Sequence, residues 1–243
     1  MLIINADDWG RCRAETDAAL ACYCAGRINS VSAMVFMEDS ERAADLAKEA
    51  GLDVGLHLNL NQTFTAKVHS PRLADYHTGI VRFMVMSKYA QLLYNPRLRK
   101  AFQFVYHAQI EEFIRLYGRP PSHTDGHQHR HLCSNMVLDE VIPRGERVRR
   151  NFSFWPGEKG LLNRAYRRLV DKRLARRYRL TDFFFSLSRC LQTKTLERVC
   201  HLARASTVEL MTHPADSAEY AYLISNEHLL RLSDLPSASF GRL

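Results

Sequence analysis

Short apolar runs alternate with helix-like segments along the chain, and this alternation restricts the fold more than any other feature. The first predicted strands are residues 2–6, 31–36 and 52–60, and the helices predicted between them are residues 14–25 and 39–51. Gly26 and Gly51 stand where those two helices should end, as glycine often does after a last helical turn. A strand, a helix and a further strand in repetition are typical of βα units, whose strands lie parallel.

The alternation continues beyond residue 60. Further helices are expected at residues 83–94, 97–117, 136–142, 160–178, 194–205 and 226–232, and further strands at residues 148–154, 183–187 and 208–212 and in a short segment that ends at Asp125. Residues 61–80 lack clear periodicity and predict a loop insertion. No repeat or linker divides residues 1–243, so we expect a single α/β domain. Its length and alternation favour an irregular (β/α) TIM-like barrel over an open doubly wound sheet.

Polar residues that could do chemistry stand at the ends of the predicted strands. They are Asp7 and Asp8, His57, Asp125 with His127, and His213. In a (β/α) barrel the carboxyl ends of the strands converge on one face, where active sites are built. Each residue taken alone has a simpler explanation, such as a helix cap for the two aspartates or a core position for His57. Their joint placement favours one cleft.

The segment 122–131 reads Ser-His-Thr-Asp-Gly-His-Gln-His-Arg-His and is unusually rich in histidine. Histidine is the commonest metal ligand, and histidine-rich tracts are a signal for metal binding. One carboxylate with two imidazoles would leave positions open for water and substrate, as catalytic metal sites do. The alternative is a solvated polar turn. The segment therefore favours a metal site in the same cleft.

Four segments in order carry a family resemblance. They are Ile4-Asn-Ala-Asp-Asp-Trp-Gly10, Gly55-Leu-His-Leu-Asn-Leu60, His123-Thr-Asp-Gly-His-Gln-His129 and Glu209-Leu-Met-Thr-His-Pro214. Together they resemble the YdjC-like carbohydrate deacetylases, which include chitooligosaccharide deacetylases and hopanoid-biosynthesis-associated deacetylases. The resemblance implies an irregular (β/α) barrel and a metal-dependent hydrolase that removes acetyl groups from N-acetylated sugars. Ala215 replaces a glycine usual in the family, and residues 61–65 also depart from its pattern, which leaves the substrate open.

The resemblance also implies roles for individual residues. Asp8, His57 and His127 would bind the metal. Asp7 would be the general base that takes a proton from the attacking water, and His213 the general acid that protonates the departing amine. Asp125 would orient an imidazole, and His129 would line the pocket.

The resemblance implies one Mg²⁺ ion, whereas two imidazole ligands favour Zn²⁺ or another transition metal. The expected partner is a small amino sugar or sugar conjugate. A homodimer stays open, and no nucleic acid is expected in this interpretation.

The formal charge of +8 is concentrated in one basic helical segment, residues 144–179. It contains thirteen Lys or Arg and three acidic residues. Such a segment could bind nucleic acid, an anionic membrane or an acidic substrate, or it could be a solvated helix face. Arg149 and Arg150, at the start of a predicted strand, are candidates to contact a substrate oxygen or phosphate.

Two other functions remain open from the sequence. Two histidines and one carboxylate also describe the iron site of non-haem Fe(II) oxygenases, and the basic segment alone would suit a non-catalytic protein that binds nucleic acid or a membrane surface.

The six cysteines show no C-x-x-C spacing and predict free thiols. There is no apolar run long enough to span a bilayer and no leader pattern, so a cytoplasmic location is expected.

Overall fold

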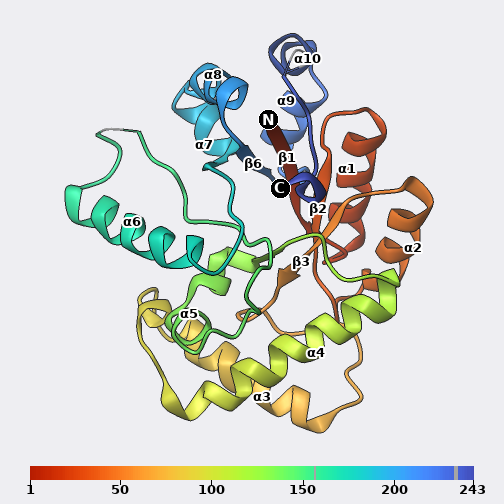
Figure 1. Cartoon of the computed structure of the whole chain (residues 1–243). Helices are drawn as coiled ribbons and strands as arrows, with labels where there is room; N and C mark the ends of the chain where they lie inside the picture. Colours follow the sequence, from red (N-terminus) through yellow and green to blue (C-terminus); the bar gives the residue numbers. More distant parts are fainter. Residues whose placement is uncertain (156, 233–234) are drawn as a thin grey trace.

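Six parallel strands form one curled sheet at the centre of the computed structural model, which describes residues 1–155, 157–232 and 235–243 (Figure 1). The strands are β1 (Leu2–Trp9), β2 (Ser30–Ala33), β3 (Val54–Leu58), β4 (Thr124–Gly126), β5 (Phe183–Ser186) and β6 (Val208–Thr212). Their order across the sheet is β4-β3-β2-β1-β6-β5, and every neighbouring pair is parallel. The predicted α/β domain with parallel strands is therefore confirmed.

The two faces of β1 differ in character, as the two-residue period of a strand allows. All eight residues of β1 are buried. Leu2, Ile4 and Ala6 belong to the main apolar core. Asn5 and Asp7 lie on the opposite face, where the Asn5 side-chain amide donates a hydrogen bond of 2.9 Å to Asp7 Oδ1. The inner face of the sheet therefore carries polar groups, although every residue of the strand is shielded from water.

Helices surround the sheet (Figure 1). The α-helices are α1 (Arg13–Cys24), α2 (Ser40–Ala50), α3 (Pro71–Val85), α4 (Arg99–Tyr117), α5 (Ser134–Leu138), α6 (Leu161–Ala175), α7 (Leu187–Gln192), α8 (Leu196–Ala205), α9 (Ser217–Leu223) and α10 (Asn226–Leu232). Short 3-10 helices are η1 (Ala90–Leu92), η2 (Pro96–Leu98), η3 (His127–Leu132) and η4 (Phe240–Arg242). As predicted, α2 ends at a left-handed glycine, Gly51, with a φ of 67°. Helix α4 ends in the same way at Gly118, with a φ of 68°.

Residues 61–70 form a loop, as predicted, but α3 begins at Pro71, so the predicted loop over residues 61–80 is too long and the predicted helix over residues 83–94 is misplaced. Pro71 occupies the first helical turn, and the Ser70 hydroxyl accepts a hydrogen bond from Leu73 N as an N-cap. The buried stripe of α3 consists of Leu73, His77, Ile80 and Met84. A histidine in that stripe hides the apolar periodicity, which explains the error.

The predicted strand at residues 148–154 is also wrong, because this segment pairs only at isolated points. Arg149 N donates to Thr124 O of β4 at 3.1 Å, and Ser153 N donates to Phe184 O of β5 at 2.8 Å. β4 and β5 are the two edge strands. The segment therefore contacts both edges of the curled sheet without being a regular strand. This position places Arg149 inside the curl.

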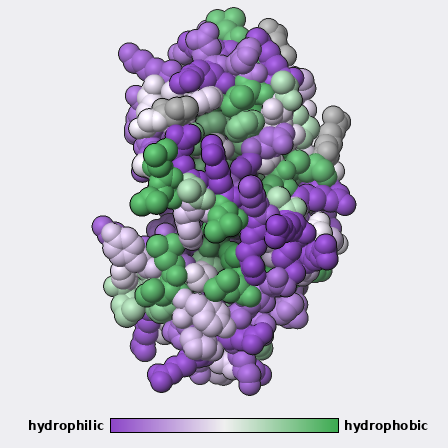
Figure 2. All heavy atoms as spheres, turned by 60° about the vertical axis from the view of Figure 1, so that its left-hand side comes forward, coloured by the Kyte–Doolittle hydropathy of each residue, from purple (hydrophilic) through white to green (hydrophobic). Residues whose placement is uncertain are grey.

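The basic segment 144–179 is helical only over α6, which stands at the left of Figure 1 on the side that Figure 2 turns forward. The sequence did not predict two short helices, α7, which follows β5, and α9, which follows β6. Within the described residues no helix is long and apolar enough to cross a membrane. All six cysteines are free thiols, and four of them are buried.

Candidate active site

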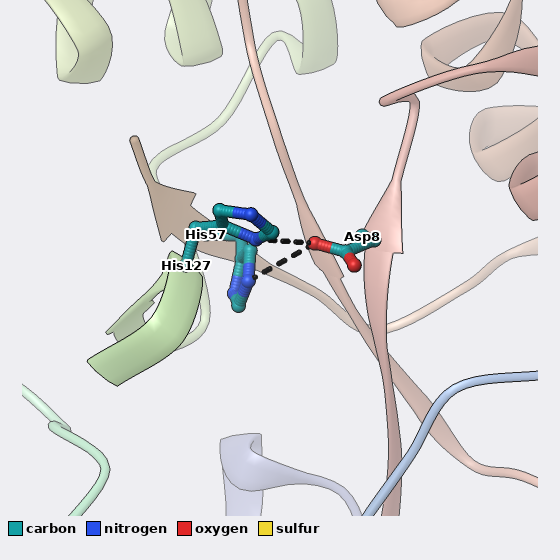
Figure 3. A group of neighbouring side chains, drawn as sticks. All are labelled: Asp8, His57 and His127. Atoms are coloured by element: carbon teal, nitrogen blue, oxygen red, sulfur yellow. Dashed lines mark hydrogen bonds and ion pairs between the residues drawn. The ribbon is translucent and has the colours of Figure 1, made fainter. Parts of the chain in front are cut away.

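Three residues from three strand ends meet on the inner side of the sheet (Figure 3). Asp8 lies near the end of β1, His57 lies in β3, and His127 directly follows β4. Asp8 Oδ1 is 2.8 Å from His127 Nδ1 and 3.3 Å from His57 Nε2. One donor atom from each residue lies within 4.8 Å of the others. The structure thus brings together the three residues expected to bind a metal.

The backbone of β1 is irregular at the aspartate pair, and this irregularity lets both carboxylates reach the inner side. Ala6 pairs with Val31 and Trp9 with Ala33, so three steps along β1 match two along β2. Asp8 has a φ of 65°, a left-handed conformation that a non-glycine residue adopts at a cost of order 1–3 kcal/mol. Neighbouring residues of a regular strand would point to opposite faces. The bulge in β1 therefore allows the side chains of Asp7 and Asp8 to reach the same side of the sheet.

His57 is held from its other side by Asp125. The His57 Nδ1 atom is 2.8 Å from Asp125 Oδ1, which leaves Nε2 directed toward Asp8. Asp125 is fully buried and also accepts a hydrogen bond of 2.8 Å from the Ser32 hydroxyl. An imidazole that donates a hydrogen bond from one ring nitrogen to a carboxylate presents its other nitrogen to a metal in a fixed orientation. The surroundings of His57 therefore fit a metal ligand.

The cluster stabilises positive charge. Burial disfavours a charged imidazole, but Asp125 and Asp7 outweigh it and raise the pKa of His57 to about 10. Burial likewise opposes the charge of Asp8, yet hydrogen bonds from His127 and His57 hold the pKa of that carboxyl well below its usual range. A divalent cation would supply positive charge where these carboxylates favour it. The charge distribution thus fits the donor set.

Arg149 lies beneath the cluster and is fully buried. Its guanidinium donates two hydrogen bonds of 2.7 Å to the two oxygens of Asp7 and one of 2.6 Å from Nε to Glu209 Oε1. It also lies 2.6 Å from Asp125 Oδ2. With no exposed surface, Arg149 is not placed to contact a substrate, contrary to the prediction. Its burial among three carboxylates gives it a different task, which is to hold Asp7 and Asp125 in place.

Arg150 points away from the cluster. Its guanidinium lies 2.8 Å from Asp171 Oδ2 of α6 and donates a hydrogen bond to the Thr181 carbonyl at 3.2 Å. Arg150 therefore joins the irregular segment to α6 and does not face the metal cluster. The predicted substrate contact of Arg150 finds no support in this placement.

His213 follows β6, and its side chain is 39% exposed. Its backbone N–H donates a hydrogen bond of 2.7 Å to Glu219 Oε2, and its Nδ1 is 3.8 Å from Glu219 Oε1. Partial burial lowers the pKa of His213, but Glu219, Asp7 and Asp8 outweigh it and raise the pKa above its ordinary value. His213 is thus an accessible imidazole biased toward its protonated form.

The sequence of this chain matches the family of YdjC-like proteins over residues 1–234. It belongs to that family. It is 29% identical to a carbohydrate deacetylase of Mus musculus, with 88% of this chain and 77% of that protein aligned. It is 30% identical to a chitooligosaccharide deacetylase of Proteus mirabilis, with 88% and 81% aligned.

A crystal structure of an Enterococcus faecalis protein shares the fold. Its name proposes cellobiose-phosphate cleavage, and it superposes with a TM-score of 0.68 at 18% identity over 99% of this chain and 97% of that one. At this low identity the likeness supports the fold of the YdjC-like chain and carries no statement about its reaction.

A second group of this YdjC-like protein could also hold a cation. It consists of Asp7, His57 and Asp125. Arg149 already neutralises both carboxylates of this second group through contacts of 2.6 to 2.7 Å. A cation there would have to compete with a buried guanidinium. The group of Asp8, His57 and His127 is therefore the better metal candidate.

His129, which was expected to line the pocket, packs among aromatic rings. Its ring centroid lies 4.5 Å from that of Phe152 and 5.6 Å from that of Phe184. Burial and the charge of Arg149 lower the pKa of His129 well below its usual value. His129 is therefore a neutral, packed imidazole beside the site.

The sequence did not single out two residues that support the site, Glu209 and Glu219. Glu209 lies in the fully buried strand β6 and accepts a hydrogen bond from Arg149 Nε. A charged residue inside an apolar strand was the available signal for it. Glu219 is the fourth residue of an Asp-x-x-Glu pattern whose Asp216 caps α9 by accepting from Ala218 N and Glu219 N. That capping pattern, which begins one residue beyond His213-Pro214-Ala, was the signal for Glu219.

Proposed function

We propose that this YdjC-like protein is a metal-dependent carbohydrate deacetylase that hydrolyses the acetamide of an N-acetylated amino sugar. The observation that carries the proposal is the cluster of Asp8, His57 and His127, with a carboxylate, Asp7, on one side and a protonatable imidazole, His213, nearby. The deacetylase names of relatives that align over most of this chain support the same reaction. We further infer that residues 146–153 stand in for the strands that would close a TIM-like barrel.

Asp8, His57 and His127 are the residues that would hold the metal. A bound divalent cation would polarise the acetamide carbonyl and stabilise negative charge on its oxygen. The two imidazoles favour Zn²⁺ or another transition metal, while family resemblance keeps Mg²⁺ as a candidate. Asp125 fixes the orientation of His57 in either case.

Asp7 is assigned as the general base. Its Oδ2 is 4.0 Å from His57 Nε2, on the side of the cluster. Arg149 and Asn5 fix the carboxylate with hydrogen bonds of 2.7 to 2.9 Å, yet Oδ2 receives only one of them. A carboxylate oxygen can accept two hydrogen bonds, so Oδ2 keeps a lone pair for a proton of the attacking water. Oriented in this way, Asp7 can act without rearranging its neighbours.

His213 is assigned as the general acid. An amine is a poor leaving group, so the nitrogen of the acetamide must gain a proton as the C–N bond breaks. His213 carries a raised pKa and an accessible ring, which are the two properties that this step needs. The products would be acetate and the free amino sugar.

A non-haem Fe(II) oxygenase would use the same three ligands. Asp7 and His213 favour hydrolysis, because a hydrolase needs a base and an acid on either side of the metal and an oxygenase has no use for that pair. Oxygen consumption that depends on added Fe²⁺ would be the sign of the alternative reaction.

The test is acetate release from N-acetylglucosamine oligosaccharides by protein stripped of metal and reloaded with Zn²⁺, Mg²⁺, Mn²⁺ or Fe²⁺. We expect release only with added metal, and its loss in Asp8→Ala. The control Asp45→Asn changes an exposed aspartate of α2 and should leave release unchanged. Release that survives in Asp8→Ala, or that needs no metal, would contradict the proposal.

A further inference from the structure

Helix α6 turns its apolar side toward the solvent. Of its fifteen residues only Leu174 is buried. Leu161, Leu162 and Leu169 are 80%, 89% and 69% exposed. The inward side of α6 carries Leu174, Val170 and also Asp171, which binds Arg150. A surface helix normally buries its apolar stripe against the core, so this orientation leaves a row of leucines without a partner in the described chain.

The apolar surface continues across a groove beside α6. The groove has a volume of about 490 Å³ and lies between α6 and the segment of η3 and α5. Tyr166 and Leu169 line one wall, and Leu132 and Leu138 line the other. We call the set Leu161, Leu162, Tyr166, Leu169, Leu92 and Leu138 the apolar face, since each of these side chains is at least 48% exposed. Figure 2 shows hydrophobic residues among hydrophilic ones on this side.

Basic residues border the apolar face. Lys172, Arg173 and Arg176 line the same groove. Helix α6 itself contains five Lys or Arg and a single acid, Asp171, whose carboxylate is engaged by Arg150. Exposed leucines bordered by lysine and arginine are the pattern of a helix that lies in the interface of a bilayer.

We propose that the apolar face docks α6 onto an anionic lipid bilayer. The leucines would enter the boundary of the acyl chains, and the basic groups would lie at the anionic headgroups. Tyr166, which is half exposed, has the amphipathic ring that favours such an interface. This inference goes beyond the proposed deacetylase activity and does not depend on it.

The charges favour a bilayer over two other partners. A symmetric dimer formed through this face would bring the basic groove of one copy against the same groove of the other, which repels. Nucleic acid would satisfy the basic groups but would leave leucines up to 89% exposed in water or against phosphates. A surface of anionic lipid satisfies both kinds of group at once.

Docking would also place the active site near the lipid. The 3-10 helix η3 begins at His127 of the metal cluster and ends at Leu132, which lines the groove. In the chain, only the four residues 128–131 lie between His127 of the cluster and Leu132 of the groove.

The test is co-sedimentation of the full chain with vesicles of phosphatidylcholine alone and with vesicles that also contain phosphatidylglycerol. We expect binding to the anionic vesicles only, weakened by salt. Lys172→Gln with Arg176→Gln should lower the partition constant roughly fivefold for each charge removed. Leu162→Ser with Leu169→Ser should lower it by roughly tenfold or more for each leucine. All four side chains are exposed, so the folded state should persist, which circular dichroism checks.

Matched controls lie on other helices. Leu230→Ser removes a leucine of α10 that is also 80% exposed, and Lys48→Gln with Arg204→Gln removes two charges from α2 and α8. These variants should bind vesicles as the natural sequence does. The proposal is overturned if anionic vesicles do not bind at low salt, if the controls weaken binding equally, or if scattering shows a dimer that Leu162→Ser dissociates.

Discussion

Arg149 binds both oxygens of Asp7 through two hydrogen bonds of 2.7 Å, entirely out of contact with solvent. The same guanidinium reaches Asp125 and Glu209. Burial disfavours its charge, but these three carboxylates outweigh it and raise the pKa of Arg149 well above its ordinary value. One cation thus fixes the proposed base and also the carboxylate that orients His57.

Replacing Arg149 should destabilise the fold and disturb the base. Arg149→Met would leave three carboxylates buried without their partner, which costs about 3–5 kcal/mol of unfolding free energy. Arg149→Lys keeps the charge but loses the paired geometry, so Asp7 should lose its orientation. Urea denaturation measures the first effect and kcat the second. Arg204→Met, at an exposed position of α8, is the control, and equal stability of the two Met variants would contradict the prediction.

Asp125→Asn should weaken metal binding with little change in fold. The carboxylate of Asp125 lies 2.8 Å from His57 Nδ1, and loss of its charge makes the imidazole a poorer and less oriented donor. Replacing such a partner typically lowers metal affinity about 10–100-fold. Calorimetric titration of metal-stripped protein with Zn²⁺ measures the change. Asp39→Asn is the matched control, since Asp39 is also buried but binds Arg42 elsewhere. Unchanged affinity in Asp125→Asn would show that His57 needs no such support.

The sequence predicted the residues of the candidate metal cluster because they stand at strand ends. Apolar runs and the polar residues that follow them are local patterns, and parallel strands bring those ends together. Strand ends predicted a wider set of candidates, and the family resemblance implied that Asp8, His57 and His127 are the ligands among them. The bulge in β1 is needed to bring the three residues together, and the sequence contains no pattern that predicts this bulge.

The role of Arg149 could not be read from the sequence, because it depends on which way an irregular segment faces. Arg149 and Arg150 are neighbours of the same type, yet one is fully buried beneath Asp7 and the other binds Asp171. The Arg149 backbone is held at β4 by the hydrogen bond from Arg149 N to Thr124 O, which turns the Arg149 side chain to the inside. The start of helix α3 was not predicted because a local pattern does not show that tertiary packing buries His77.

Buried neutral histidines should make the fold sensitive to acid. Burial lowers the pKa of His77, His123, His131 and His228 to about 4 each. Each folded pKa lies below the unfolded value, so this stabilisation is fully present above about pH 6.5 and is lost as the pH falls toward 4. Each such histidine makes the unfolding free energy fall more steeply with decreasing pH, by about 1.4 kcal/mol per pH unit.

His77→Gln tests one of these contributions. His77 donates a hydrogen bond of 3.2 Å from Nε2 to Asn59 O and stacks on Phe64 with centroids 3.6 Å apart. The variant will be less stable at every pH. The slope of its unfolding free energy against pH, between pH 6.5 and 4, should be smaller by the amount that one proton contributes, about 1.4 kcal/mol per pH unit. Denaturant unfolding across this range measures the slope. His201→Gln, at an exposed site of α8, should leave the slope unchanged, and an unchanged slope in His77→Gln would refute the assignment.

Glu219→Gln should move the alkaline limit of catalysis to lower pH. Partial burial lowers the pKa of His213, and Glu219 is the first of the groups that raise it. Without that carboxylate His213 loses its proton at lower pH, so kcat/KM should begin to fall earlier as the pH rises, while its plateau below that limit changes little. The measurement is the pH profile of kcat/KM for acetate release.

The control for Glu219→Gln is Asp216→Asn, which alters the cap of the same helix. Asn is as good an N-cap as Asp, so α9 and the carboxylate of Glu219 should stay in place. A role of Glu219 that is only structural would lower kcat/KM equally at every pH in Glu219→Gln. A displaced alkaline limb with an intact plateau requires instead that Glu219 act on the proton of His213. That outcome would support His213 as the general acid.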